Sequence, residues 1–135
     1  MRLRKDAKIE LLKRVPLFAR CGRRELDEIA QIADEINLPA GRELTREGAR
    51  GDEFFVLASG TADVTRDGEQ VRRLGDGDFF GEISLLTGLP RTATVTTSSA
   101  VDALVVTDRA FRQLLERIPT VRERVLEALG ERLDS

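Results

Sequence analysis

Between residues 37 and 106 the chain consists of short apolar runs separated by glycine, and this pattern limits its fold more than any other feature. The run Phe54-Phe55-Val56-Leu57 ends at Ser59-Gly60, and a shorter run ends at Asp67-Gly68. An Asp-Gly pair between two apolar runs is a strong signal for a two-residue β-hairpin turn. Many short strands with regular turns favour a β-roll over a parallel sheet. Further strands are predicted at about 70–74, 92–97 and 101–106.

Helical periodicity flanks this region on both sides. The N-terminal part predicts a short helix that ends before Pro16 and a second helix over about 23–33. After the strands, Thr107-Asp108 can cap a helix, and Pro119 separates that helix from a last one. The chain is therefore predicted to have one helical layer before the strands and two helices after them.

The predicted fold class is α+β, a double-stranded, jelly-roll-like β-roll flanked by N-terminal helices and two C-terminal helices. A chain of 135 residues is long enough to build one core without disulfides. We expect a single domain over 1–135, with N-terminal helices at 1–36, the roll at 37–106 and C-terminal helices at 107–135.

The residue types that most catalytic sites require are scarce. The sequence has no histidine and one cysteine, Cys21. Transition-metal sites and nucleophile–histidine–acid arrangements depend on these residues, as do the metal-dependent cupin enzymes that share a β-roll architecture. Asp76, Asp78 and Glu82 omit an oxygen ligand of the calcium-loop spacing. We predict no catalytic residues, no metal and no cofactor, and expect a protein that is not an enzyme.

Charge is distributed unevenly along the chain. The net charge is −2, yet residues 1–24 hold nine Lys/Arg against two Asp/Glu. A basic N-terminal helix could contact nucleic acid or a membrane surface, although a solvated helix face beside an acidic neighbour is the favoured interpretation. No apolar signal region or membrane-spanning stretch is present, and one cysteine suits a reducing compartment. The expectation is a cytoplasmic protein with no membrane span and no nucleic acid bound by this domain.

The segment 80–95 combines a glycine turn, a carboxylate, a helix start and an arginine. A helix that begins near Glu82 points unpaired N–H groups toward what lies before it, and Gly81 allows a ligand close to the main chain. Arg91 offers a fork of donors to phosphate oxygens. The Glu82 carboxylate would repel a phosphate but can accept a hydrogen bond from a hydroxyl. A small ligand with one phosphate and one sugar hydroxyl fits these groups.

Residues 80–93 closely resemble the phosphate-binding cassette of cyclic nucleotide-binding domains. Its pattern reads Phe-Gly-Glu, a small residue, Leu, a short gap, then Arg, one of Thr, Ser or Ala, and Ala. The match is ungapped, and the stretch from Glu47-Gly48 to Ser59-Gly60 resembles the family's second glycine-rich hairpin. The resemblance covers nearly the whole chain. It implies that Glu82 receives the ribose 2′-hydroxyl and that Arg91 meets the cyclic phosphate. The cassette residues implied to bind ligand are Phe80, Gly81, Glu82, Ile83, Ser84, Arg91, Thr92 and Ala93.

The same resemblance places a purine base along the roll. Val64, Arg72 and Leu74 align with positions that neighbour the base, although Val64 and Leu74 also fit plain core roles. Arg72 departs from the apolar residues common at its position, and its stem could still cover the ring. The Thr92 hydroxyl can assist phosphate binding or meet the guanine amino group of a syn base. The ligand is expected to be cAMP in preference to cGMP.

A domain that binds a ligand without transforming it can signal only if the ligand has different affinities for two conformations of the domain. In the family the C-terminal helices move, and here residues 109–133 are the corresponding segment. Arg132 aligns with an arginine that packs on the purine, and Leu133 follows it as an apolar cap. Gly130 favours an early helix end and a solvent-facing Arg132 instead, because glycine in a helix interior costs about 1 kcal/mol.

Two other functions compete with a cyclic-nucleotide sensor that acts on a protein effector or forms a homodimer through its terminal helices. The chain could be the sensor domain of a DNA-binding regulator that lacks its helix-turn-helix. It could instead be a β-roll that no longer binds ligand, although Gly81, Glu82, Arg91 and Ala93 argue against this.

Overall fold

The computed structural model describes residues 5–134, and the side chains of residues 8–132. The strands are β1 (Asp34–Leu38), β2 (Glu43–Thr45), β3 (Glu53–Ser59), β4 (Ala62–Arg66), β5 (Glu69–Leu74), β6 (Phe79–Phe80), β7 (Thr94–Thr97) and β8 (Val101–Thr107). The helices are α1 (Lys5–Lys13), the short 3₁₀ helix η1 (Pro16–Phe18), α2 (Arg23–Ile32), α3 (Glu82–Thr87), α4 (Asp108–Arg117) and α5 (Pro119–Asp134).

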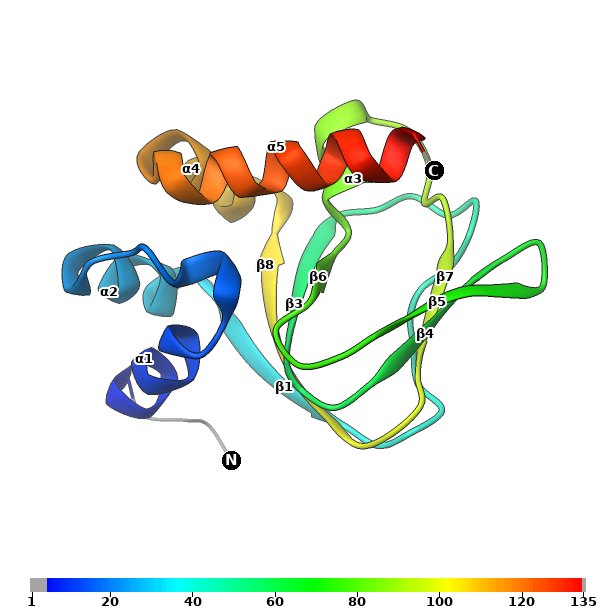
Figure 1. Cartoon of the computed structure of the whole chain (residues 1–135), viewed down its shortest axis with the longest axis horizontal. Coiled ribbons are helices and arrows are strands. Elements are labelled where there is room, and N and C mark those ends of the chain that lie inside the picture. Colours follow the sequence, from blue (N-terminus) through cyan, green and yellow to red (C-terminus); the bar gives the residue numbers. More distant parts are fainter. Residues whose placement is uncertain (1–4, 135) are drawn as a thin grey trace.

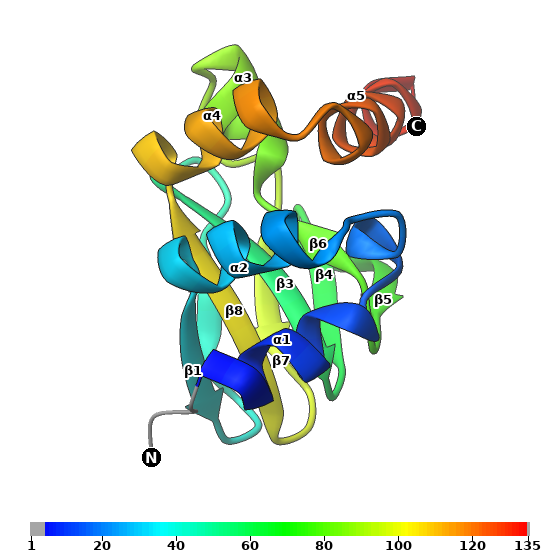
Figure 2. The ribbon, with the colours of Figure 1, turned by 90° about the vertical axis from the view of Figure 1, so that its left-hand side faces the viewer.

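The strands form two four-stranded antiparallel sheets, in the orders β1-β8-β3-β6 and β2-β7-β4-β5. The two sheets make up the roll, and the helices gather around the first of them (Figure 1). Seen from the side in Figure 2, α1 and α2 lie in front of this sheet, with α3, α4 and α5 above it. The predicted α+β class with a double-stranded roll is confirmed.

Strand β3 separates two hydrophobic cores. Phe54 and Val56 belong to the core under the helices, whereas Phe55 and Leu57 belong to the core inside the roll. Successive side chains of a strand point to opposite faces, so a strand that is buried on both sides is an uninterrupted apolar run. The central apolar run of the sequence is therefore the wall between the helices and the interior of the roll.

The same division continues into β6, where it helps to position the site. Phe79 lies in the helical core and Phe80 in the roll core. The Phe80 ring stacks on Phe55, with 4.9 Å between centroids and 10° between planes. These contacts fix the end of β6, and the chain after it turns directly into α3.

Several local predictions are confirmed. Asp67 and Gly68 join β4 to β5 with φ angles of 53° and 82°, as a hairpin turn with two left-handed residues requires. The side chain of Thr107 caps α4 by accepting a hydrogen bond from the Ala110 backbone at 3.3 Å. Pro119 begins α5, as the break in periodicity predicted.

Three boundaries differ from the sequence-based ones. The first strand begins at Asp34, earlier than the expected start of the roll at 37, because Asp34 pairs with Val105 of β8. The strand expected over 92–97 begins at Thr94, since the backbone of Arg91 pairs with the loop at 48–49. The early end at Gly130 is wrong, because α5 continues to Asp134.

Candidate functional site

A glycine turn connects β6 to the short helix α3. Gly81 has φ of 100°, a left-handed conformation that side chains rarely adopt. A Cβ at this position would lie 2.7 Å from the Glu53 carbonyl oxygen and 3.0 Å from Nη1 of Arg91. Glycine is therefore required both by the backbone angle and by the close approach of the arginine.

The cassette gathers buried polar side chains around one small cavity. Glu82 is 1% exposed, Ser84 6% and Arg91 8%, so each has been withdrawn from water. The cavity has a volume of about 50 Å³. It is lined by Thr45, Val64, Arg72, Phe80, Gly81, Glu82, Ile83, Ser84, Arg91, Thr92, Ala93, Val95 and Arg132.

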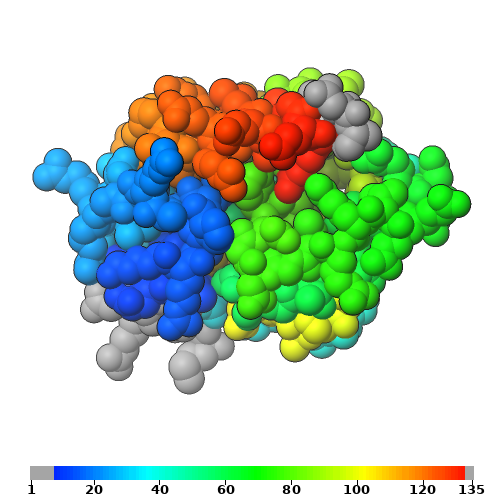
Figure 3. Space-filling model, in the orientation of Figure 1, coloured from blue at the N-terminus to red at the C-terminus, as the bar shows by residue number. Residues whose placement is uncertain are grey.

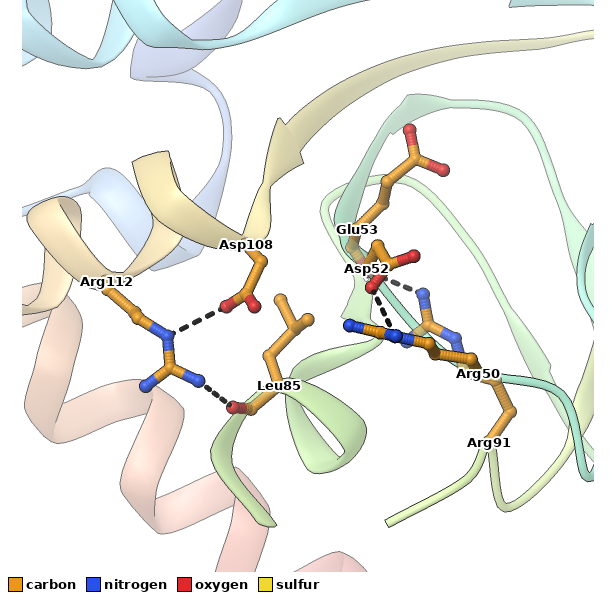
Figure 4. Close-up of polar contacts among 7 residues, drawn as sticks. All are labelled: Arg50, Asp52, Glu53, Leu85, Arg91, Asp108 and Arg112. Atoms are coloured by element: carbon orange, nitrogen blue, oxygen red, sulfur yellow. Dashed lines mark hydrogen bonds and ion pairs between the residues drawn. The ribbon is translucent and has the colours of Figure 1, made fainter. Parts of the chain in front are cut away.

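The fork of Arg91 is held in place by backbone carbonyls. Its Nη1 donates to the Gly81 oxygen at 2.9 Å and its Nη2 to the Glu53 oxygen at 2.7 Å. Burial lowers the pKa of Arg91 from its ordinary value, and the nearby Glu53 and Asp52 act in the opposite direction. The side chain reaches the start of β3, where Asp52 and Glu53 lie (Figure 4). Arg91 is thus a preorganised cation at the edge of the cavity.

Gly51 allows this arrangement. A Cβ on Gly51 would lie 2.5 Å from Cζ and 2.8 Å from Cδ of Arg91, closer than atoms in contact can approach. The φ angle of Gly51 is not in the left-handed region, so its backbone conformation does not require glycine. The close approach of the guanidinium requires it.

At the other side of the cassette, Glu82 meets an arginine from the last turn of α5. Nη1 of Arg132 donates to Oε1 of Glu82, and Nη2 donates to the Phe79 carbonyl oxygen at 2.7 Å. The guanidinium also lies over the Phe79 ring, with Cζ 4.9 Å from its centroid. Burial, and to a lesser extent the positive charge of the nearby Arg72, lower the pKa of Arg132 to about 10, and Asp78 acts in the opposite direction.

The C-terminal helices hold α3 at both of its ends. Arg132 of α5 reaches Glu82 at the start of α3, while Nη2 of Arg112 in α4 donates to the Leu85 carbonyl oxygen at 3.0 Å. Nε of Arg112 is bonded to Asp108 at 2.9 Å, and Figure 4 shows this arginine bridging α4 and the cassette helix. The position of α3 is thus coupled to both α4 and α5.

The remaining predicted residues lie at the roll end of the cavity, with one exception. Val64 of β4 pairs with Arg72 of β5, and both line the cavity. Burial lowers the pKa of Arg72, an effect that Asp78 opposes. Leu74 does not line the cavity, because it is packed with Val64 inside the roll core. The predicted apolar cap Leu133 lies outside the side chains that the structure describes.

Thr45 and Val95 line the cavity, although the sequence pattern did not identify them. Val95 could have been found from strand alternation, since it follows the predicted Ala93 by two residues on β7. Thr45 had no local signal. Its hydroxyl donates to the Ala93 carbonyl oxygen at 3.1 Å, a contact between segments 48 residues apart.

Over residues 5–134, no helix is long and apolar enough to cross a membrane. Among the side chains that the structure describes, no cluster of three or more His, Cys, Asp or Glu residues could hold a metal ion.

The chain is similar to parts of longer proteins that are named for cyclic nucleotides. It is 34% identical over 123 residues to a Drosophila melanogaster cGMP-dependent protein kinase, isozyme 2 forms cD5/T2, which covers 85% of this chain and 13% of the relative. It is 37% identical over 106 residues to a Yarrowia lipolytica cAMP-dependent protein kinase regulatory subunit, covering 77% of this chain and 28% of the relative. The chain therefore spans only a small part of these curated relatives.

Solved structures and a family model agree with this similarity. The regulatory domain of Toxoplasma gondii PKA, solved with cAMP, has a TM-score of 0.84 at 22% identity and covers 95% of this chain and 50% of that one. This likeness supports the fold. The model of the cyclic nucleotide-binding domain matches residues 35–118, which include almost the whole roll and the whole cassette. This chain belongs to the cyclic nucleotide-binding domain family.

Proposed function

We propose that this domain binds a 3′,5′-cyclic purine nucleotide, with cAMP preferred to cGMP, and that it serves as a sensor without catalysing a reaction. The observation that carries the proposal is the pairing of a buried carboxylate, Glu82, with a buried guanidinium, Arg91, on one small cavity. The guanidinium suits a phosphate monoanion, and the carboxylate suits a ribose hydroxyl. The remaining cavity residues, including Arg72, Thr92 and Arg132, form the rest of the proposed ligand site.

The relatives are named for both ligands, so the preference for cAMP stays a prediction. The regulatory subunit named for cAMP is 37% identical to this chain, and the kinase named for cGMP is 34% identical. Thr92 lies on the cavity beside Arg91 and would favour cGMP if its hydroxyl met a guanine amino group. The affinities of the domain for cAMP and cGMP distinguish these two possibilities.

The proposed readout is movement of α4 and α5. Both helices contact α3, α4 through the Arg112–Leu85 hydrogen bond and α5 through the Arg132–Glu82 ion pair. A ligand that contacts α3 changes the energy of these contacts, and a difference in affinity between two helix positions shifts their populations. The molecule that receives the signal would be a protein effector or a second copy of the chain.

Isothermal titration calorimetry of the domain with cAMP, cGMP and linear 5′-AMP tests the proposal. We expect saturable binding of the cyclic nucleotides, tighter for cAMP, and much weaker binding of 5′-AMP. The small cavity should suit a compact monoanion better than a flexible dianion. Equal affinity for cAMP and 5′-AMP, or no binding of either cyclic nucleotide, would contradict the proposed function.

A further inference from the structure

The carboxylate that is proposed to receive the ligand is already occupied by another part of the chain. Glu82 is paired with Arg132, which lies 50 residues further along, in the last turn of α5. Their side chains are 1% and 15% exposed, so the pair is largely removed from water. In Figure 3 the red end of α5 lies directly against the surface of the roll, drawn in green.

This contact has a clear electrostatic reason. A buried carboxylate is costly unless a positive charge or hydrogen-bond donors compensate it. The Arg132 guanidinium supplies both, and its second nitrogen is held by the Phe79 carbonyl oxygen at 2.7 Å. The Phe79 ring, 4.9 Å from Cζ, covers the guanidinium in the geometry of a cation–π contact. These contacts place the Arg132 guanidinium beside Glu82.

The cavity is also too small for a nucleotide while this contact persists. Its volume is about 50 Å³, whereas pockets for small ligands usually measure about 300–1,000 Å³. Arg132 is one of the side chains that line it. A ligand that places a hydroxyl on Glu82 therefore needs more room, and displacement of the Arg132 side chain would supply it.

We propose that Arg132 competes with the ribose 2′-hydroxyl of the ligand for Glu82, and thereby sets both the affinity of the site and its selection for a ribose. The inference rests on the proposed function, because it takes a cyclic nucleotide as the ligand. In the unliganded domain α5 keeps Glu82 neutralised and the cavity closed. Binding exchanges one partner of Glu82 for another and frees the last turn of α5.

Burial makes the Arg132–Glu82 contact less favourable than the ion pair alone would be. Burial and the positive charge of Arg72 both oppose the charged form of Arg132, and its pKa is lowered to about 10. The guanidinium remains charged near neutral pH but is held at some cost. Release to solvent recovers that cost, which offsets part of the lost ion pair.

The decisive variant is Arg132→Ala. It removes the competitor, so we expect cAMP to bind roughly tenfold more tightly, and association to be faster. The affinity for 2′-deoxy-cAMP should rise less, because that ligand gains no bond to Glu82. The ratio of the two dissociation constants should therefore increase. Arg132→Lys keeps the positive charge and should remain within a few-fold of the wild type.

Two controls separate competition from a general effect on α5. Arg124→Ala removes an arginine from the same helix, one that pairs with Glu127 at 3.7 Å on the surface, and should leave both ligands unaffected. In a Glu82→Gln background, Arg132→Ala should no longer change the ribose selectivity. Affinities come from calorimetry, and association rates come from stopped-flow measurements with a fluorescent cAMP analogue.

A ligand-free measurement tests the contact by itself. Hydrogen exchange at backbone amides of residues 130–134 should accelerate in both Arg132→Ala and Glu82→Gln, but not in Arg124→Ala. Unchanged exchange in these variants would overturn the inference, as would unchanged or weaker cAMP binding by Arg132→Ala. Faster release of cAMP from Arg132→Ala without faster association would also overturn it, and would indicate that Arg132 instead covers the base of the bound ligand. Failure of both the wild type and Arg132→Ala to bind any cyclic nucleotide would instead reject the proposed function itself.

Discussion

Arg91 is positioned by groups that lie far from it in the sequence. Its fork is held by the carbonyl oxygens of Gly81 and Glu53, and Gly51 leaves room for its guanidinium. These contacts fix the direction of the donors before any ligand arrives, and preorganised donors lose less freedom on binding. The proposed affinity for a phosphate thus depends on geometry as well as on charge.

Removal of the arginine should show how much of the affinity this charge supplies. Arg91→Ala is expected to weaken cAMP binding by about 1.5–3 kcal/mol, the usual range for a hydrogen bond to a charged group. Arg91→Lys keeps the charge but loses the fork, so its affinity should fall between those of the wild type and the alanine variant. Calorimetry measures the affinities, and circular dichroism checks that each variant remains folded. A wild-type affinity in Arg91→Ala would remove this residue from the proposed site.

Gly51→Ala tests the geometry while the charge is left intact. The added methyl group would lie 2.5 Å from Cζ of Arg91 and must push the guanidinium aside. We expect weaker cAMP binding with the fold retained, because the displaced atoms belong to a side chain. Gly75→Ala is the matched control, since a Cβ there meets nothing within 4 Å and its φ is not left-handed. Equal affinities of the two variants would show that the position of Arg91 is unimportant for binding.

At the scale of elements, α3 is the point where the cassette meets the C-terminal helices. The helix has only six residues, too few to be stable alone, because isolated helices below about 12–15 residues are marginal in water. Its conformation therefore depends on tertiary contacts, which include those made by Arg112 and Arg132. A short helix held by its neighbours is suited to changing position when those contacts change.

Arg112→Ala should loosen this connection. It removes the donor to the Leu85 carbonyl oxygen at 3.0 Å, so we expect a loss of about 1 kcal/mol in the free energy of unfolding. Amides of α3 should also exchange faster with solvent. Arg109→Ala is the control, because this neighbouring arginine on α4 is exposed. If both variants showed the same α3 exchange as the wild type, the bridge from α4 would carry no coupling.

At the scale of the whole molecule, ligand binding and stability are linked. A ligand that binds only the folded state stabilises it by about 2.7 kcal/mol when its concentration is one hundred times the dissociation constant. Differential scanning calorimetry should therefore show a higher Tm with cAMP, and 5′-AMP at the same concentration should have little effect. Calorimetry suits this chain, which has no Trp or Tyr for intrinsic fluorescence. An unchanged Tm at saturating cAMP would contradict binding to the folded domain.

Much of the architecture is determined by local sequence signals. The Asp67-Gly68 pair specifies the β4–β5 hairpin, because both residues adopt positive φ with little strain. Thr107 and Pro119 mark the starts of α4 and α5 through capping and through a fixed backbone angle. All eight predicted cassette residues line the cavity, since they belong to one short motif, and Val64, Arg72 and Arg132 line it from elsewhere in the chain.

Contacts between distant segments were decided only by the tertiary structure. Local propensity favours an end of α5 at Gly130, because glycine in a helix interior is less favourable than alanine by about 1 kcal/mol. In the structure the helix instead continues to Asp134. Val121 and Val125 pack in the core, and Arg132 pairs with Glu82. Thr45 on the cavity wall and Gly51 beneath Arg91 likewise have no local signal. Charge pairing and close packing depend on distances in space, which one-dimensional patterns do not contain, and so the partner of Glu82 emerged only from the folded chain.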